Sequence, residues 1–348
     1  MFHDLKIAQV RSEGRGAVAI RFDLPAKLAD EFAFLPGQFL TVRAEIGGAE
    51  LRRNYSLACA PGEGLTIGIR HVEGGAFSGF AQGLKTGDRM QVMAPDGRFC
   101  WSGEQNILLI AAGSGITPMV SIASAALEAG ADVTLVFGNR QMDTIMFRSD
   151  LEALKDRYLE RFSLIHVLSR ELQDVPLFEG RIDADKITAL AASRLIDPQA
   201  ADAVFLCGPE GMIDTAEQAL SDLGVASEKV RKELFATSGG FMLPSSPVGQ
   251  KALAEGVEVS FRLDGVERRI TMEERDRSVL DAAARHGLEL PYSCKGGMCC
   301  TCRCKVTEGG AEMAVNYSLE PWEVAAGFTL ACQARPTTAR LALDFDAV

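Results

Sequence analysis

Histidine is scarce in this sequence, which contains four: His3, His71, His166 and His286. None of them follows a glutamate by three positions, so the Glu-x-x-His ligand pair of di-iron carboxylate proteins is absent. An excess of basic residues is also lacking, because the formal net charge is −11. A nucleic-acid-binding protein would carry a basic face, so the charge argues against that class.

The sequence also lacks an uninterrupted apolar run of membrane-spanning length. The stretch 106–127 carries no charged residue, but Gly113, Gly115 and Pro118 interrupt it. A buried strand, a turn and a buried helix explain this pattern better than a membrane span. The opening residues, MFHDLKIAQVRSEGRG, contain no apolar core of signal-peptide length. We therefore expect a cytoplasmic protein that does not bind membranes.

The first segment of the chain, residues 1–103, consists of short apolar stretches separated by turn residues. Many short strands in one run predict a small antiparallel β-barrel. The expected strands are KIAQVRS, AVAIRFDL, QFLTVRAEI, RRNYSLA, LTIGIRHV and RMQVMAPDG.

The second segment, residues 104–236, has a different rhythm. Apolar runs such as ILLIAA, VTLVFG, FSLIHVL and AVFLCG alternate with helical patterns. This alternation predicts an α/β domain with a parallel sheet flanked by helices.

The third segment follows a stretch rich in Gly, Ser and Pro, and we expect a linker at 237–256. In residues 257–348, VEVSFRL and RRITM indicate a hairpin, and SVLDAAARHG indicates a helix that ends at Gly287. The sequence therefore predicts a multidomain protein with an α+β domain at its C-terminal end.

Cysteine is abundant, and five of the nine cysteines fall within CKGGMCCTCRC. An odd number of cysteines in a cytoplasmic protein makes a disulfide knot the weakest interpretation. Cys294, Cys299 and Cys302 are spaced C-x4-C-x2-C, and Cys332 follows further along the chain. This is the plant-type [2Fe–2S] arrangement, whereas structural zinc sites more often have two short C-x2–4-C hooks. Zinc is the alternative.

Other residues of the cysteine segment support a cluster. Gly296 and Gly297 let the backbone approach closely, so that its N–H groups can reach sulfur atoms. Cys300 and Cys304 exceed the four ligands, and we expect them to behave as small apolar residues.

The segments PYSCKGGMCCTCRCKV and FTLACQ resemble a plant-type ferredoxin domain, which has a β-grasp fold. RRNYS resembles the R-x-Y-S signature of the ferredoxin–NADP reductase superfamily. By this resemblance, Arg53 pairs with the pyrophosphate of a flavin, since a guanidinium suits phosphate. Tyr55 packs against the isoalloxazine, and the Ser56 hydroxyl lies near flavin N5. A half-buried strand with a surface arginine is the alternative explanation of RRNYS.

The segment GGAFS adds a second phosphate site, because glycines that open a short helix present free N–H groups. Two phosphate sites imply FAD rather than FMN. The residues assigned to this site are Gly74, Gly75, Phe77 and Ser78.

Two further segments resemble the nicotinamide-binding elements of the same superfamily. In AAGSGITP, the glycines let the backbone approach a pyrophosphate, and the proline starts a helix. In LCGP, Cys207 is implied to lie beside the nicotinamide ring, and the alternative is a buried core thiol. The residues assigned to the two segments are Gly113, Gly115, Thr117 and Pro118, then Cys207, Gly208 and Pro209.

The end of the second segment, ELF, is where this superfamily places an acid and an aromatic ring near the flavin. The resemblance therefore assigns Glu233 and Phe235 to the site of hydride transfer, together with Ser56 and Cys207.

The nucleotide preference depends on the residue that meets the adenosine ribose. A cation after the second parallel strand favours a 2′-phosphate, and VFGNR places Arg140 there. We therefore expect NADPH as the electron donor, with a solvated loop arginine as the alternative.

Over the whole chain the sequence resembles the family of reductase subunits of phenylacetyl-CoA epoxidase. The segments FLPGQFLTVRAEIGGAELRRNYSL, CGPEGMIDTAEQAL and NYSLEPWEVAAGFTLACQA carry this resemblance. It implies electron transfer from NADPH through FAD and a [2Fe–2S] cluster to the di-iron oxygenase subunits of the same complex. Because the chain lacks the Glu-x-x-His pair, oxygen activation is expected in another polypeptide.

Two alternatives differ in function. The chain could reduce another acceptor, such as a Rieske oxygenase or a hybrid-cluster protein. It could also be a non-enzymatic iron–sulfur or zinc module joined to an unrelated α/β domain.

Overall fold

The computed structural model describes residues 1–235, 253 and 256–347. The chain divides into two compact units, Met1–Phe235 and Ala236–Val348. The expected linker at 237–256 lies outside the described residues, apart from positions 253 and 256. Across the described ranges, no helix combines the length and apolar character that a bilayer crossing requires.

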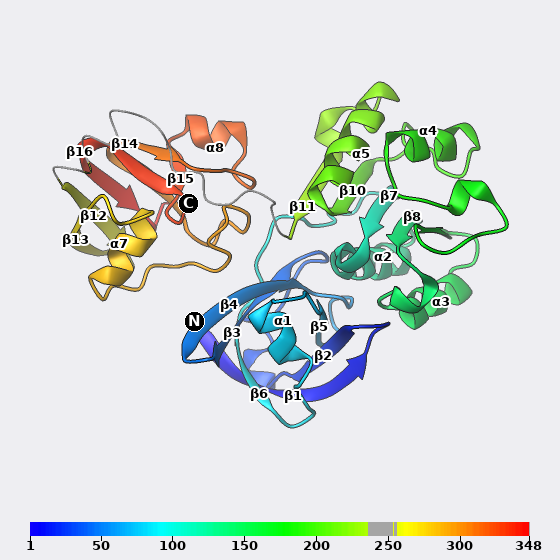
Figure 1. Ribbon diagram of the computed structural model, residues 1–348, viewed down its shortest axis with the longest axis horizontal. Helices are drawn as coiled ribbons and strands as arrows, with labels where there is room; N and C mark the ends of the chain where they lie inside the picture. The colour runs from blue at the N-terminus through cyan, green and yellow to red at the C-terminus, as the bar shows by residue number, and fades with distance from the viewer. Residues whose placement is uncertain (236–252, 254–255, 348) are drawn as a thin grey trace. The chain divides into compact units, whose positions relative to one another are not determined.

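The first half of unit one is an antiparallel barrel built from six strands in the order β4-β3-β6-β1-β2-β5 (Figure 1). An antiparallel bridge between Leu57 and Ile67 connects the two edge strands, and the inward-facing apolar side chains form one core. The predicted barrel is therefore confirmed. Its strands are β1 (Phe2–Ser12), β2 (Ala17–Asp23), β3 (Phe39–Ile46), β4 (Ala49–Ser56), β5 (Leu65–Arg70) and β6 (Arg89–Met93), with α1 (Ala76–Ala81) between β5 and β6.

The second half of unit one is a parallel sheet in the order β11-β10-β7-β8-β9. Buried side chains of α2 and α3 pack on one face of the sheet, and those of α4 and α5 pack on the other. The predicted α/β domain is confirmed. Its elements are β7 (Asn106–Ala112), α2 (Ile116–Glu128), β8 (Asp132–Asn139), α3 (Arg148–Arg157), β9 (Phe162–Leu168), α4 (Ala184–Ala192), β10 (Ala203–Gly208), α5 (Glu210–Asp222) and β11 (Val230–Leu234).

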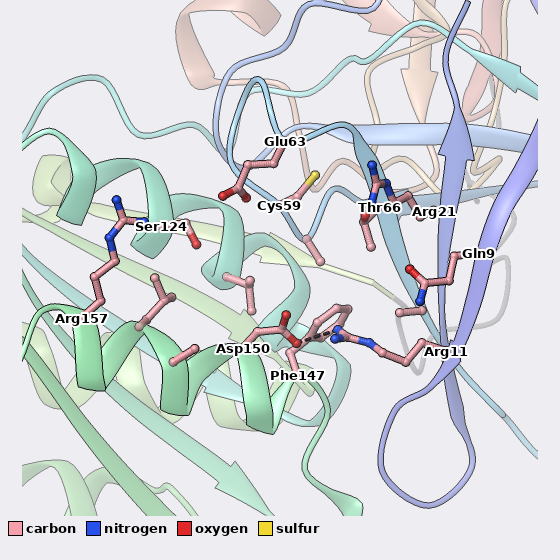
Figure 2. A pocket seen from close by; sticks show the side chains of 15 residues that line it. Gln9, Arg11, Arg21, Cys59, Glu63, Thr66, Ser124, Phe147, Asp150 and Arg157 are labelled. Carbon is pink, nitrogen blue, oxygen red and sulfur yellow. Dashed lines mark hydrogen bonds and ion pairs between the residues drawn. The ribbon is translucent and has the colours of Figure 1, made fainter.

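The barrel and the parallel-sheet half are joined through the turn after β1. The Glu13 carboxylate accepts a hydrogen bond from the Phe147 amide at 2.7 Å, and Arg11 pairs with Asp150. A cavity of about 370 Å³ lies beside these residues, between β1, β2 and helices α2 and α3 (Figure 2). Because Asp150 pairs with Arg11 there, we interpret this cavity as part of the packing between the halves.

Unit two contains a mixed sheet in the order β13-β12-β16-β14-β15, in which β12 and β16 are parallel. The Ser278 hydroxyl caps helix α7 (Val279–Arg285), and Gly287, at φ +72°, follows its end, as the sequence predicted. The elements are β12 (Val257–Leu263), β13 (Val266–Met272), α7 (Val279–Arg285), β14 (Arg303–Met313), α8 (Pro321–Ala325), β15 (Phe328–Leu330) and β16 (Ala334–Asp344). The predicted α+β fold is confirmed.

Candidate functional site

The carboxyl ends of the parallel strands form one edge of the sheet, where α/β proteins bind nucleotides. Gly115 lies so close to β10 that a Cβ on it would be 2.1 Å from the Cys207 carbonyl oxygen. Only glycine avoids this clash. The GSG turn and the LCGP turn, predicted separately, are therefore in direct contact.

The GSG turn begins at Gly113, whose φ of +58° favours glycine. The Thr117 hydroxyl donates to the Ser114 carbonyl at 3.0 Å, and Pro118 is buried in the first turn of α2. Thr117 and Pro118 thus shape the turn, and the backbone N–H groups remain the groups suited to a phosphate.

Arg70, at the end of barrel strand β5, reaches this turn although the sequence analysis did not assign it. A Cβ placed on Gly113 would lie 3.0 Å from Arg70 Nη1. Burial and the nearby charge of Arg140 lower the pKa of Arg70. Two cations that face each other favour an anion between them. The sequence signal that could have identified Arg70 is its position as a cation at a strand end, just before the glycines of GGAFS.

Arg140 follows β8 and is exposed. Its carbonyl accepts a hydrogen bond from the Arg170 amide at 2.8 Å, so the segments after β8 and β9 run together. A hollow of about 430 Å³ lies at the end of β9 and is lined by Ser169, Arg170 and Glu179, among others. Arg170 is therefore a second cation placed where an adenosine ribose could meet it.

The three residues assigned from RRNYS all lie on β4. The exposed Arg53 donates to the Arg52 carbonyl at 2.7 Å. Tyr55 packs against Phe77 with ring centroids 5.8 Å apart, and burial raises its pKa to about 12. The contact with Phe77 holds the Tyr55 ring beside α1.

The GGAFS residues form the start of α1, with Gly74 at φ +73° and Gly75 as the N-cap. The Phe77 side chain is 2% exposed and belongs to the barrel core. The Ser78 hydroxyl accepts from the Val72 amide at 3.0 Å. In Phe77 and Ser78, therefore, the backbone N–H groups rather than the side chains are available to a phosphate.

The four residues assigned to hydride transfer come from both halves of unit one. The Ser56 hydroxyl donates to Glu233 Oε2 at 3.2 Å, and Glu233 pairs in register with Cys207 on the neighbouring strand. Burial raises the pKa of Glu233 to about 8, although the hydrogen bond from Ser56 lowers it. Phe235 follows β11 and is partly exposed. The structure thus brings together a hydroxyl and a carboxyl whose pKa is raised.

Cys207 differs from the other three because its side chain is 0% exposed and packs in the core of the parallel-sheet half. Burial raises the pKa of its thiol well above the usual value. A nicotinamide ring could contact this thiol only after a covering group moved aside. Gly208 and Pro209 lead into α5, where a Cβ on Gly208 would lie 2.6 Å from the Met212 methyl group.

The four cysteines assigned to a cluster form two pairs in unit two. Cys299 receives a side-chain hydrogen bond from Cys294, which lowers the pKa of Cys299 to about 6. Cys302 and Cys332 form the second hydrogen-bonded pair, and the Cys299 charge acts on both of them. A [2Fe–2S] cluster needs two thiolates for each of two irons, and two adjacent pairs match this requirement.

Zinc would need a different arrangement. Within 1–235, 253 and 256–347, no three His, Cys, Asp or Glu side chains converge as ligands of a single metal ion. Structural zinc requires four ligands around one ion. The two thiol pairs instead suit two irons, as in a [2Fe–2S] cluster.

A backbone amide and a side-chain amide point at the thiols, as suits the sulfur ligands of a cluster. The Gly296 amide donates to Cys294 Sγ at 3.3 Å, and Gln333 Nε2 donates to Cys332 Sγ at 3.5 Å. The two surplus cysteines have other partners. Cys300 Sγ faces the Ser318 carbonyl at 3.5 Å, and Cys304 is buried in the core.

A buried ion pair fastens the end of the cysteine segment. Glu323 on α8 is 0% exposed, and its carboxylate accepts from Arg303 Nε at 2.8 Å. The Arg303 guanidinium stacks over Phe328 at 3.5 Å from the ring centroid. Since Arg303 directly follows Cys302, this pair fixes the backbone beside an expected cluster ligand.

Comparison with known families agrees with the three folds. Residues 4–101 match the oxidoreductase FAD-binding domain, and residues 109–218 match the oxidoreductase NAD-binding domain. Residues 261–337 match the 2Fe-2S iron-sulfur cluster binding domain. The chain is therefore an NAD(P)H-dependent oxidoreductase with FAD and a [2Fe–2S] cluster, of the class that serves oxygenases as reductase components.

The chain belongs to the family of the E component of 1,2-phenylacetyl-CoA epoxidase. It is 44% identical to that component from Escherichia coli K12, over 99% of this chain and 98% of the relative. It is 34% identical to the ferredoxin reductase component of 3-ketosteroid-9-alpha-monooxygenase from Rhodococcus rhodochrous, over 98% of this chain and 96% of that relative. Phthalate dioxygenase reductase shares the fold, with a TM-score of 0.59 and 22% identity over 99% of this chain and 98% of that one.

The raised pKa of Glu233 predicts a pH-dependent stability. Between its ordinary pKa of 4.5 and about 8, the unfolded chain loses a proton that the folded protein retains. The contribution of Glu233 to the free energy of unfolding should therefore be complete below the lower value and fall as pH rises toward about 8. Glu233→Gln should remove on the order of 1–3 kcal/mol of this dependence, discounted for partial exposure.

Urea unfolding of the flavin-free protein at about pH 5 and about pH 8.5 measures this difference. The exposed Glu73→Gln variant is the matched control and should behave like the wild type. Identical pH profiles for wild type and Glu233→Gln would contradict the assignment.

The thiol pairs predict which cysteines hold the cluster. Alanine at Cys294, Cys299, Cys302 or Cys332 should remove the [2Fe–2S] absorption while FAD stays bound, because one of the two irons would lose a ligand. Cys300→Ala and Cys304→Ala should keep it. If Cys300→Ala lost the [2Fe–2S] absorption and Cys299→Ala kept it, the assignment of Cys299 rather than Cys300 as a ligand would be wrong.

The Glu323–Arg303 pair predicts a second effect on the cluster. Glu323→Gln leaves the half-buried Arg303 guanidinium without its carboxylate, so the ligand segment should loosen. We expect faster cluster loss to a chelator and a shifted electron paramagnetic resonance spectrum. Asp276→Asn removes the Arg285 partner elsewhere in unit two and serves as control. Equal cluster loss in the two variants would indicate general destabilisation only.

Proposed function

We propose that this chain is the reductase of a phenylacetyl-CoA epoxidase and passes electrons from NADPH to di-iron oxygenase subunits. The observation that carries this proposal is the 44% identity to the Escherichia coli relative across nearly the whole of both chains. FAD, when bound, accepts electrons in pairs from a nicotinamide and releases them singly to a [2Fe–2S] cluster.

Each cofactor would be held by residues already placed in the structure. Arg53 and the amides of Gly75 and Ser78 would hold the FAD diphosphate, and Tyr55 would pack on the flavin ring. We further propose four parts of the chain: a flavin domain at 1–103, a nucleotide domain at 104–236, a linker at 237–256 and a ferredoxin domain at 257–348.

Ser56 and Glu233 would supply or take up the proton that accompanies electron transfer. With a pKa of about 8, Glu233 holds a proton at neutral pH and is hydrogen-bonded to the Ser56 hydroxyl. A protonated carboxyl next to a hydroxyl can supply or take up one proton within the site. Cys207 and Phe235 would contact the nicotinamide side of the same site.

The proposal is tested by reconstitution. The purified protein is mixed anaerobically with NADPH, and the flavin and cluster bands should bleach. Addition of epoxidase oxygenase subunits, phenylacetyl-CoA and oxygen should then give the epoxide. Bleaching without epoxide formation, accompanied by activity with a Rieske oxygenase, would refute the epoxidase role and leave the reductase class standing.

Two arginines predict different effects on nucleotide use. Arg140→Ala should lower discrimination in favour of NADPH roughly ten- to a hundredfold, or about 1.5–3 kcal/mol, because it removes a charged contact to the 2′-phosphate. Arg70→Ala should weaken the binding of NADPH and of NADH equally, because both nucleotides carry the pyrophosphate.

The measurement is kcat/KM for ferricyanide reduction with each nucleotide. Arg170→Ala is the informative comparison, since Arg170 lies beside the same hollow. An unchanged nucleotide ratio in Arg140→Ala, with a lowered ratio in Arg170→Ala, would move the 2′-phosphate site to Arg170.

A further inference from the structure

The stretch 316–325, which contains α8 and is called here the α8 segment, lies against the cysteine loop. The Tyr317 amide and the Ser318 hydroxyl donate to the Gly297 carbonyl at 3.1 and 3.0 Å. The Arg303–Glu323 ion pair makes a further connection after Cys302. Hydrogen bonds within the loop, at Gly297, and at its end, at Arg303, hold the α8 segment beside the expected cluster ligands.

The α8 segment carries exposed apolar side chains on either side of its buried residues. Leu319 and Glu323 are buried, whereas Tyr317, Trp322 and Val324 are 37%, 63% and 44% exposed. Among the described residues of unit two, the one other exposed large apolar side chain is Val266, at the opposite edge of the sheet. Exposed apolar side chains therefore concentrate beside the cysteine loop.

An exposed tryptophan on a fixed helix is typical of a protein interface. Large aromatic side chains supply much of the binding energy at interfaces, and tryptophan is enriched at their centres. Here the residue next to Trp322 is the fully buried Glu323, so the backbone that carries the indole is anchored. The α8 segment is therefore built to present an apolar surface.

The charges around this surface indicate the chemistry of its partner. Lys305 Nζ lies 5.4 Å from the Phe328 ring centroid and has no acidic partner among the residues described. Arg303 is neutralised by Glu323, and Lys295 lies 3.9 Å from Asp281. The Glu320 carboxylate caps α8. Lys305 is thus a cation near Phe328 on β15, the strand that α8 contacts, and it suits an acidic rim on the partner.

We propose that Tyr317, Trp322 and Val324, with Lys305 at their rim, form the surface on which the electron-accepting oxygenase protein docks. The inference rests on the proposed function and specifies its partner surface. An electron leaves the cluster most readily where a partner approaches its ligands, and the α8 segment is bonded to the ligand loop. The partner would offer an apolar pocket bordered by carboxylates.

The test uses the full-length protein with FAD and the cluster bound. Stopped-flow absorbance follows flavin reduction by NADPH, cluster reduction by the flavin, and cluster reoxidation by the epoxidase oxygenase subunits. Trp322→Glu should slow reoxidation about tenfold or more and leave the first two steps unchanged. Val266→Glu, which adds the same charge at the opposite sheet edge, should leave all three steps unchanged.

Lys305→Glu should flatten the fall of the reoxidation rate with salt, because steering by this charge would be lost. If Trp322→Glu is reoxidised at the wild-type rate, the proposed docking surface is wrong. The proposal is also wrong if Trp322→Glu slows cluster reduction by the flavin instead, since the surface would then serve the intramolecular transfer. A wild-type protein that reduces no epoxidase oxygenase overturns the proposed function together with the surface.

Discussion

The contact between Gly115 and the Cys207 carbonyl leaves no room for a side chain, and the nucleotide site depends on it. A Cβ at Gly115 would lie 2.1 Å from that oxygen, far inside van der Waals contact. The contact fixes the turn after β7 against the end of β10. Because β11 pairs with β10 in register, Glu233 is placed opposite Cys207, and from there it reaches Ser56 on the barrel. One glycine therefore links the nucleotide turn to the hydrogen bond between the two halves of unit one.

The sequence predicted most of the fold because the physical signals are local. Alternating strands with turn residues indicate a barrel, and buried apolar runs alternating with helices indicate a parallel sheet. In unit two the same signals predicted β12, β13 and α7. The remaining strands were not predicted, because β14 contains Gly309 and Gly310 and β15 has three residues. Their pairing comes from contacts distant in sequence, which propensity does not capture.

The candidate site was predicted less completely than the fold, for a related reason. Motifs located Arg53, Gly113 and the cysteines, because each motif is contiguous or regularly spaced. Arg70 was missed, because its closeness to Gly113 arises only when the barrel packs on the parallel sheet. The burial of Phe77 and of Cys207 is likewise tertiary. A motif therefore located these residues, but only packing decides whether a side chain or its backbone can face a ligand.

Two of the buried or half-buried glutamates, Glu323 and Glu233, have different surroundings that suit them to different tasks. Glu323 faces the guanidinium of Arg303, so its charge is compensated and the pair acts as a fixed connection. Removing one member of such a pair leaves an uncompensated charge, which costs about 3–5 kcal/mol. Glu233 instead faces the Ser56 hydroxyl, and burial raises its pKa to about 8. A carboxyl without a cationic partner can exchange its proton near neutral pH, whereas a paired carboxylate cannot do so without breaking its ion pair. The partner of each carboxyl therefore determines whether it can serve proton transfer or hold a loop in place.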